Sequence, residues 1–267
     1  MSTNKTTPVA VIVGASTKYQ SHDDGADLPL SVRWGLGGAL SQRFAKSYTV
    51  VLMARRAEEL RDLAQAIEGQ GGRAIAVVCD VTDNNSVQTA FAQAAGIGPI
   101  EVVVYNVAPA FPPGVTFANL PLPHEVDPAY LNMALDIGVT GCLRCVRAVI
   151  PDMLAAGKGT ILLSGATLAL RGGALLALWS PVKFALRSLG QSLNQAYGAK
   201  GIHVAHVVID GLIDSPALRH QFAGQEVAFL DPAEIADAYM MLVEQPKSCW
   251  SYELQLTPQG SSLGMRL

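Results

Sequence analysis

Two glycine-rich motifs near the start of the chain have the residue types of a phosphate-binding turn. An apolar run, Val9–Val13, leads into Gly-Ala-Ser, and Gly-Leu-Gly-Gly follows after an inserted polar loop at residues 17–34. Glycines between a strand and a helix allow a tight turn and let backbone N–H groups reach a pyrophosphate at the helix N-terminus. The residues expected to hold that pyrophosphate are Gly14, Ser16, Gly35, Leu36 and Gly37.

Two adjacent arginines, Arg55 and Arg56, follow the second apolar run, Thr49–Met53. A dinucleotide without a 2′-phosphate is usually held by an acidic side chain at this strand end, where this chain has Ala54. Arginine presents a planar fork of donors that matches a phosphate. The arginines could instead be solvated side chains at a helix start, but the helix dipole disfavours cations there. We therefore expect the cofactor to be NADP(H) rather than NAD(H).

The elements that position these residues follow a regular alternation of short apolar runs and amphipathic stretches of helical length. Near-continuous β-branched runs are typical of strands buried on both faces of a parallel sheet, joined by right-handed βαβ connections. We expect a single α/β Rossmann domain over residues 1–267, with a doubly wound parallel sheet of about seven strands. The predicted strands are Val9–Val13, Thr49–Met53, Ala74–Val78, Glu101–Tyr105, Thr160–Ser164, Ile202–Val208 and Tyr252–Leu256. The predicted helices include Ala57–Glu68, Ser86–Ala95, Ala129–Ala156, Pro181–Tyr197 and Asp231–Glu244.

Composition narrows the class of protein. The chain has 267 residues, of which 50% are hydrophobic and 15% charged, and its net charge is −3. A chain without a basic run gives no electrostatic reason to expect nucleic acid. No apolar run approaches the ~20 residues of a membrane span, and the polar residues 1–7 lack the apolar stretch of a signal peptide. We expect a cytoplasmic protein. Cys142 and Cys145 lie in an apolar helical stretch without further ligands nearby, which favours packing over metal binding.

Further motifs at the predicted strand ends resemble the short-chain dehydrogenase/reductase family, from Val9 to about Leu256. Asp80-Val81 is similar to that family's adenine-contacting motif, and Tyr105-Asn106-Val107-Ala108 is similar to its Asn-Asn-Ala-Gly motif. Lys183 matches the lysine that contacts the nicotinamide ribose, and the segment Asp210–Ser215 stands where the family approaches the cofactor's amide and phosphates. The cofactor contacts that this resemblance implies are Asp80, Val81, Asn106, Ala108, Lys183, Ile213 and Ser215.

The sequence departs from the family at three positions of the catalytic Asn, Ser, Tyr and Lys set. Trp179 stands at the tyrosine position, four residues before Lys183, and an indole N–H cannot serve as a general acid or base. Ala166 stands at the serine position and Gly138 at the asparagine position. Of the four, Lys183 alone matches. The resemblance therefore implies an atypical member.

Hydride transfer itself needs no protein acid, only a nicotinamide held against an electrophilic carbon. An iminium accepts hydride without being protonated, whereas a ketone needs a proton donor. We expect an NADPH-dependent reductase that acts on an imine, iminium or activated alkene, with Lys183 and Trp179 as its catalytic residues. The alternative is an NADP(H)-binding protein with a non-redox role, either an enzyme that guides a cyclisation or a regulatory pseudoenzyme.

Candidate substrate contacts lie around the missing tyrosine. Trp179 is either an aromatic wall for a flat or cationic small molecule or an apolar plug in a defunct site. Ser164 and Thr167 are the nearest hydroxyls, and Arg171 either binds an anionic substrate or is a solvated loop residue. A lone His124 on the loop of residues 111–127 is expected to be structural.

Two predicted helices, Ala129–Ala156 and Pro181–Tyr197, carry apolar residues on more than one side. A helix that is apolar all round must bury its outer face as well. Related proteins pair these helices across a two-fold axis, so we expect a homodimer or homotetramer.

Overall fold

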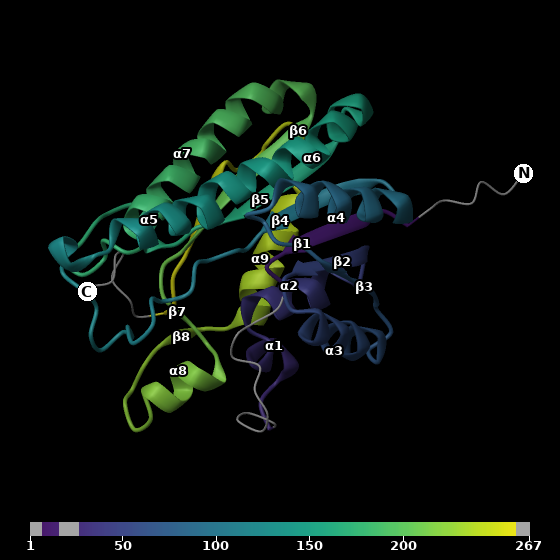
Figure 1. Ribbon diagram of the computed structural model, residues 1–267. Coiled ribbons are helices and arrows are strands. Elements are labelled where there is room, and N and C mark those ends of the chain that lie inside the picture. The colour runs from purple at the N-terminus through teal and green to yellow at the C-terminus, as the bar shows by residue number, and fades with distance from the viewer. Residues whose placement is uncertain (1–6, 16–26, 260–267) are drawn as a thin grey trace, which may run out of the picture.

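The computed structural model describes residues 7–15 and 27–259, which form one α/β fold around a parallel sheet (Figure 1). The seven strands follow the order β3-β2-β1-β4-β5-β6-β9, and every neighbouring pair is parallel. This order reverses direction between β1 and β4, which is the switch point where Rossmann folds bind ligands. The strands are β1 (Val9–Val13), β2 (Thr49–Ala54), β3 (Arg73–Val78), β4 (Ile100–Tyr105), β5 (Gly159–Ser164), β6 (Ile202–Ile209) and β9 (Glu253–Leu256).

Helices cover both faces of the sheet, as the predicted doubly wound fold requires (Figure 1). On one face α2 (Gly35–Phe44), α3 (Ala57–Glu68) and α9 (Pro232–Glu244) bury a cluster that includes Phe44, Leu63 and Tyr239. On the other face α4 (Asn84–Ile97), α6 (Gly141–Ala156) and α7 (Ser180–Tyr197) bury a second cluster, in which Cys142 and Cys145 are packing residues. Central strands are apolar throughout because both of their faces are buried.

The predicted elements match these bounds to within two residues at most of their ends. The Asp83 side chain accepts a hydrogen bond from the Asn85 N–H and caps α4, and Asp231 caps α9 through the Ala233 N–H. These caps satisfy N–H groups that have no partner within the helix, which is why each helix begins where it does.

Two predicted segments differ from the structure. The inserted loop at residues 17–34 does not extend to its predicted end, because Leu30–Arg33 form a short helix, α1, that leads directly into α2. Residues 16–26, and with them Ser16, lie outside the described part of the chain. The predicted helix Ala129–Ala156 is divided into α5 (Pro128–Leu135), a π-helical turn at Asp136–Thr140 and α6.

A small second layer lies over the carboxyl end of the main sheet. β7 (Leu212–Ile213) pairs in parallel with β8 (Phe229–Leu230), and α8 (Pro216–Gln221) lies between them in the chain. Figure 1 shows this unit projecting below the strand ends, on the side of α1. A bidentate ion pair between Arg219 and Asp214, at 2.6 and 2.7 Å, ties α8 to the segment after β7.

Across residues 7–15 and 27–259, no helix combines the length and the apolar character needed to cross a membrane.

Candidate active site

A cavity of about 620 Å³ lies at the carboxyl ends of β1, β2, β4 and the segment after β6. In parallel sheets these ends meet at one edge, which is the usual ligand position in open α/β folds. The cavity brings together residues that are far apart in the sequence but were all predicted to contact a dinucleotide. They are Gly14, Gly35, Leu36, Gly37, Arg55, Arg56, Asp80, Val81, Asn106, Ala108, Ile213 and Ser215.

The turn after β1 is packed so closely that glycine is required at two positions. Gly14 has a φ of +87°, and a Cβ atom there would lie 2.6 Å from the Asn106 carbonyl oxygen. A Cβ atom on Gly37 would lie 2.4 Å from the Gly14 carbonyl oxygen. The first turn of α2 receives no side-chain cap, and its residues Gly35, Leu36 and Gly37 line the cavity. Uncapped N–H groups and the helix dipole together favour an anion at this position.

The two arginines after β2 lie in different electrostatic surroundings. Arg56 is paired with Glu59 on the first turn of α3, at 2.6 Å. Arg55 lines the cavity, and within the described residues its guanidinium makes no ion pair. Burial raises the pKa of Asp80, but hydrogen bonds from Thr82 and the charge of Arg55 outweigh that effect and hold the pKa of this carboxyl below its ordinary value. Arg55 is therefore the arginine better placed to meet an added phosphate.

Asn106 and Lys183 are held by backbone atoms around the end of β1 and β5. The Asn106 amide donates to the Gly14 carbonyl at 3.2 Å, which fixes the glycine turn against β4. The Lys183 ammonium donates to the Ser164 carbonyl at 2.8 Å. Burial lowers the pKa of Lys183 to about 8 because the charged form loses hydration. A lysine with this pKa is close to a neutral amine under mildly alkaline conditions.

Trp179 ends the loop before α7, one helical turn ahead of Lys183. Its ring stacks edge-on against Phe111 at 4.6 Å between centroids and lies 6.4 Å from Phe117. Phe117 lines the cofactor-sized cavity and Phe111 lines a neighbouring cavity of about 560 Å³. The indole therefore supports the walls of both cavities from behind rather than forming either wall itself.

Tyr130 on α5 contacts this aromatic cluster through a side-chain hydrogen bond with Trp179. Its hydroxyl donates to the Ala110 carbonyl at 2.9 Å. Burial raises its pKa, and a side-chain hydrogen bond with Trp179 offsets part of that shift. Sequence analysis did not identify Tyr130 or Phe117, since neither carries a motif, although both belong to the loop and helix that follow β4.

None of the four predicted substrate contacts lines either cavity, and the three besides Trp179 lie as follows. The Ser164 hydroxyl is buried on the α9 face of the sheet and pairs with the Tyr239 hydroxyl at 2.8 Å. The Thr167 hydroxyl donates to the buried carboxylate of Asp210. Arg171 lies on the loop after β5, and its side chain lines neither described cavity. For Ser164 and Thr167 the prediction is corrected, because these hydroxyls have buried partners far away in the sequence.

Gly138 and Ala166 stand where the family resemblance implies an asparagine and a serine, and their surroundings differ. Gly138 lies in the π-helical turn, and a Cβ atom there would lie 2.3 Å from a methyl group of Val182 on α7. Ala166 precedes the short 3₁₀ helix Thr167–Ala169 and is partly exposed. A larger side chain at position 138 would require α7 to shift away from its neighbour.

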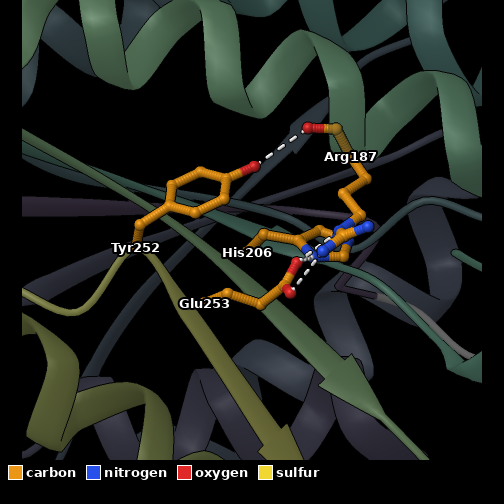
Figure 2. A network of polar contacts seen from close by, with 4 residues as sticks. All are labelled: Arg187, His206, Tyr252 and Glu253. Atoms are coloured by element: carbon orange, nitrogen blue, oxygen red, sulfur yellow. Dashed lines mark hydrogen bonds and ion pairs between the residues drawn. The ribbon is translucent and has the colours of Figure 1, made fainter. Parts of the chain in front are cut away.

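Sequence analysis also missed a polar network behind Lys183, shown in Figure 2. The buried His206 on β6 bonds Glu253 on β9 at 3.0 Å, and Arg187 on α7 holds the same carboxylate with two hydrogen bonds at 2.6 and 2.8 Å. Two features of the sequence could have indicated this network. One is a histidine within an apolar strand. The other is Arg187, which lies four residues after Lys183 and therefore on the same face of the helix.

Comparison with known proteins identifies the family. The model of the short chain dehydrogenase family matches residues 32–226. A cis-4-hydroxycyclohexanecarboxylate dehydrogenase of Sinomonas cyclohexanicum is 33% identical over 183 residues, which are 68% of this chain and 70% of that protein. The crystal structure of a short-chain dehydrogenase from Rhodopseudomonas palustris is 30% identical, with a TM-score of 0.72 over 94% of this chain and 98% of that one. A metagenomic short-chain oxidoreductase in complex with NADP is 22% identical, with a TM-score of 0.74 over 94% and 97%. The chain belongs to the short chain dehydrogenase family.

Proposed function

We propose that the protein is an NADPH-dependent reductase that transfers hydride to an imine, iminium or activated alkene. The choice of NADPH is supported by the residues that line the cavity. Its uncapped α2 turn suits a pyrophosphate, and Arg55 suits a 2′-phosphate. The NADP held by the metagenomic oxidoreductase of the same fold agrees with this choice.

The observation that carries the proposal is the side chain one helical turn before Lys183. An indole stands there, packed against Phe111, and the hydroxyls of Ser164 and Thr167 are turned to partners elsewhere. The family resemblance implies a tyrosine acid at this position. An indole at this position cannot protonate a developing alkoxide, whereas hydride transfer to an already cationic carbon needs no proton donor.

Bound NADPH would supply the hydride, and the residues of this chain would bind and orient it. Lys183 would hold the ribose hydroxyls from its place on the Ser164 carbonyl. The Gly14 and Gly37 turn would hold the pyrophosphate, while Asp80 and Val81 would lie at the adenine. Phe117 lines the cavity and would help to exclude water from it.

The coenzyme experiment compares NADPH and NADH binding to the wild-type protein and to Arg55→Ala by fluorescence titration. Each hydrogen bond to a charged phosphate contributes about 1.5–3 kcal/mol, so the variant should bind NADPH roughly ten- to a hundredfold more weakly. NADH affinity should be unchanged. Arg43→Ala is the matched control, because Arg43 pairs with Asp237 on α9, and it should bind both coenzymes normally. Equal affinity of the wild-type protein for NADPH and NADH would contradict the assignment.

A panel of ketones, imines, iminium ions and enones then tests the reaction class through the oxidation of NADPH at 340 nm. The panel also includes the oxidised form of cis-4-hydroxycyclohexanecarboxylate, because the Sinomonas relative is named for that compound. We expect turnover with imines, iminium ions and enones, and little turnover with simple ketones. Tight NADPH binding without turnover of any acceptor would favour the non-redox role, for which the packing of Trp179 into an aromatic cluster is the supporting observation.

A further inference from the structure

One buried polar group outside the cofactor cavity that calls for an explanation is the imidazole of His206. Its side chain is fully buried on β6, on the face covered by α7. Its Nε2 atom has no hydrogen-bond partner among the described protein atoms. A buried polar atom without a partner costs free energy, so such an atom in a native core calls for an explanation.

The other imidazole nitrogen is held firmly. Nδ1 bonds the Glu253 carboxylate at 3.0 Å, and Arg187 binds both oxygens of the same carboxylate (Figure 2). The Tyr252 hydroxyl donates to the Arg187 carbonyl at 2.9 Å, which ties the start of β9 to α7. A bidentate arginine–carboxylate pair fixes geometry as well as charge. The network therefore fixes the plane of the imidazole between β6, β9 and α7.

The Nε2 side of the His206 ring faces the Ser164–Gly165 peptide, whose Ser164 carbonyl binds Lys183. A Cβ atom on Gly165 would lie 2.2 Å from His206 Nε2, so the imidazole is in contact with the Gly165 backbone. The carbonyl of the preceding residue, Ser164, accepts the Lys183 ammonium at 2.8 Å. The imidazole and the ammonium thus lie against the same Ser164–Gly165 peptide, one on each of its residues.

Burial, more than charge, favours the neutral form of His206. The groups that face it are Lys183 and Arg187 from α7 and Glu253 from β9, and the β5 peptide beside it is uncharged. Burial lowers the pKa of His206 below its ordinary value, and the charges of Lys183 and Arg187 lower it further, against the opposing effect of Glu253. Arg187 also neutralises the carboxylate that would otherwise favour the imidazolium.

We infer that His206 is a positioning residue for Lys183, and that Lys183 keeps its place on the Ser164 carbonyl only while the imidazole is neutral. An imidazolium would put a second positive charge against the peptide that holds the ammonium, and in a buried setting the two cations repel each other strongly. Arg187 helps to keep the imidazole neutral, because it pairs with the Glu253 carboxylate that would otherwise stabilise the imidazolium. The inference rests on the proposed role of Lys183 in holding the cofactor ribose, and it assigns a function to the network in that same site.

The test is the pH dependence of NADP⁺ affinity, measured by calorimetry between pH 8 and pH 5. His206 becomes charged only below its lowered pKa, so wild-type affinity should fall on the acid side, by about tenfold in excess of the effect of protonating the 2′-phosphate. In His206→Asn the amide nitrogen can replace Nδ1 as a donor to Glu253 but cannot ionise. This variant should lose the excess acid fall, so that the ratio of its affinities at pH 8 and pH 5 reflects the protonation of the 2′-phosphate alone.

His203→Gln is the matched control. His203 lies on the same strand and is equally buried, but its ring stacks on Trp250 and bonds the Ser251 carbonyl at 2.9 Å, away from Lys183. It should show the wild-type pH profile. A purely structural role of His206 would change affinity by the same factor at every pH, and that result would overturn the inference while leaving the proposed function intact.

A second measurement does not depend on cofactor binding. The imidazole of His206 is titrated by NMR in the free protein, with its signal assigned from the spectrum of His206→Asn. Replacing Lys183 by Met should raise the pKa of His206, because a repelling charge is removed. Arg187→Met should also raise it. An unchanged pKa in both variants would refute the coupling, whether or not NADP⁺ binds, whereas failure of NADP⁺ to bind at any pH would refute the proposed function alone.

Discussion

At the scale of the residue, the side chain at position 179 bears most directly on the chemistry that we propose. Trp179 keeps the backbone position one turn before Lys183, where its carbonyl accepts the Lys183 N–H at 2.9 Å. Its indole packs against Phe111 and has no ionisable group to offer. The lysine beside it remains in place on the Ser164 carbonyl. At the scale of the residue, then, we expect the part of the site that holds the cofactor to be retained and the part that transfers a proton to be altered.

Restoring the altered part should restore the corresponding chemistry. We predict that Trp179→Tyr combined with Ala166→Ser raises the rate of ketone reduction by about 10²-fold, because the variant regains a proton donor and a hydroxyl for the developing alkoxide. Reduction of iminium ions should change little. The measurement is NADPH oxidation with both acceptor classes at saturating cofactor.

Trp179→Phe combined with Ala166→Ser is the control for that experiment, since it makes the same change in packing without supplying a phenol. It should gain no ketone activity. If the wild-type protein already reduces simple ketones at ordinary enzyme rates, another acid must be present, and the hydroxyl of Tyr130 beside the same indole is the first to test.

At the scale of the elements, the site depends on how closely α2 approaches the end of β1. Gly37 on α2 lies against the Gly14 and Ala15 carbonyls, where a Cβ atom would be 2.4 and 2.7 Å away. The same approach brings the first turn of α2 to the cavity. Because these neighbours are backbone atoms, they cannot move aside as a flexible side chain would.

We predict that Gly37→Ala lowers the free energy of unfolding by about 1–3 kcal/mol through overpacking and also weakens NADPH binding, since α2 must shift. Gly96→Ala on α4 is the matched control. A Cβ atom at Gly96 meets nothing within 4 Å, so alanine should stabilise the helix by about 0.5–1 kcal/mol and leave binding unchanged. Denaturant unfolding and NADPH titration check both variants. A Gly37→Ala protein as stable as the Gly96→Ala protein would contradict this account of the turn.

At the scale of the whole molecule, one face of the layered fold carries exposed apolar side chains. Met133 on α5, Leu143 on α6 and Phe184 on α7 are each 40–43% exposed. In Figure 1 these three helices form the outer layer on one side of the sheet. Large exposed apolar residues that gather on neighbouring helices are typical of a surface that associates with another chain.

We predict that the protein is a homodimer or homotetramer and that Leu143→Glu with Phe184→Glu shifts it to a monomer at micromolar concentration. Charges at the centre of a self-complementary interface repel their symmetry mates and lose water without gaining partners. Size-exclusion chromatography with light scattering measures the mass. Ile75→Glu, at an exposed apolar position on the edge strand β3, should leave the assembly unchanged. A monomeric wild-type protein would contradict the prediction.

The sequence alone determined the strand and helix order and the position of the cofactor cavity. Buried parallel strands are near-continuous apolar runs, so β1, β2, β4, β5 and β6 could be located from composition alone. Their carboxyl ends must share one edge of the sheet, and the family resemblance assigned Asp80 and Ser215 to that edge. Both residues line one cavity together with Gly14.

Only the tertiary structure decided which way the polar side chains point and with what they pair. A strand buried on both faces has no polarity pattern that distinguishes its two sides, so nothing in the sequence around Ser164 indicated that its hydroxyl faces Tyr239 on α9. The partners of Arg187 and His206 come from β9, 66 and 47 residues away. Such pairs arise from packing between distant elements, and local sequence rules describe only neighbours within a helix turn or a strand.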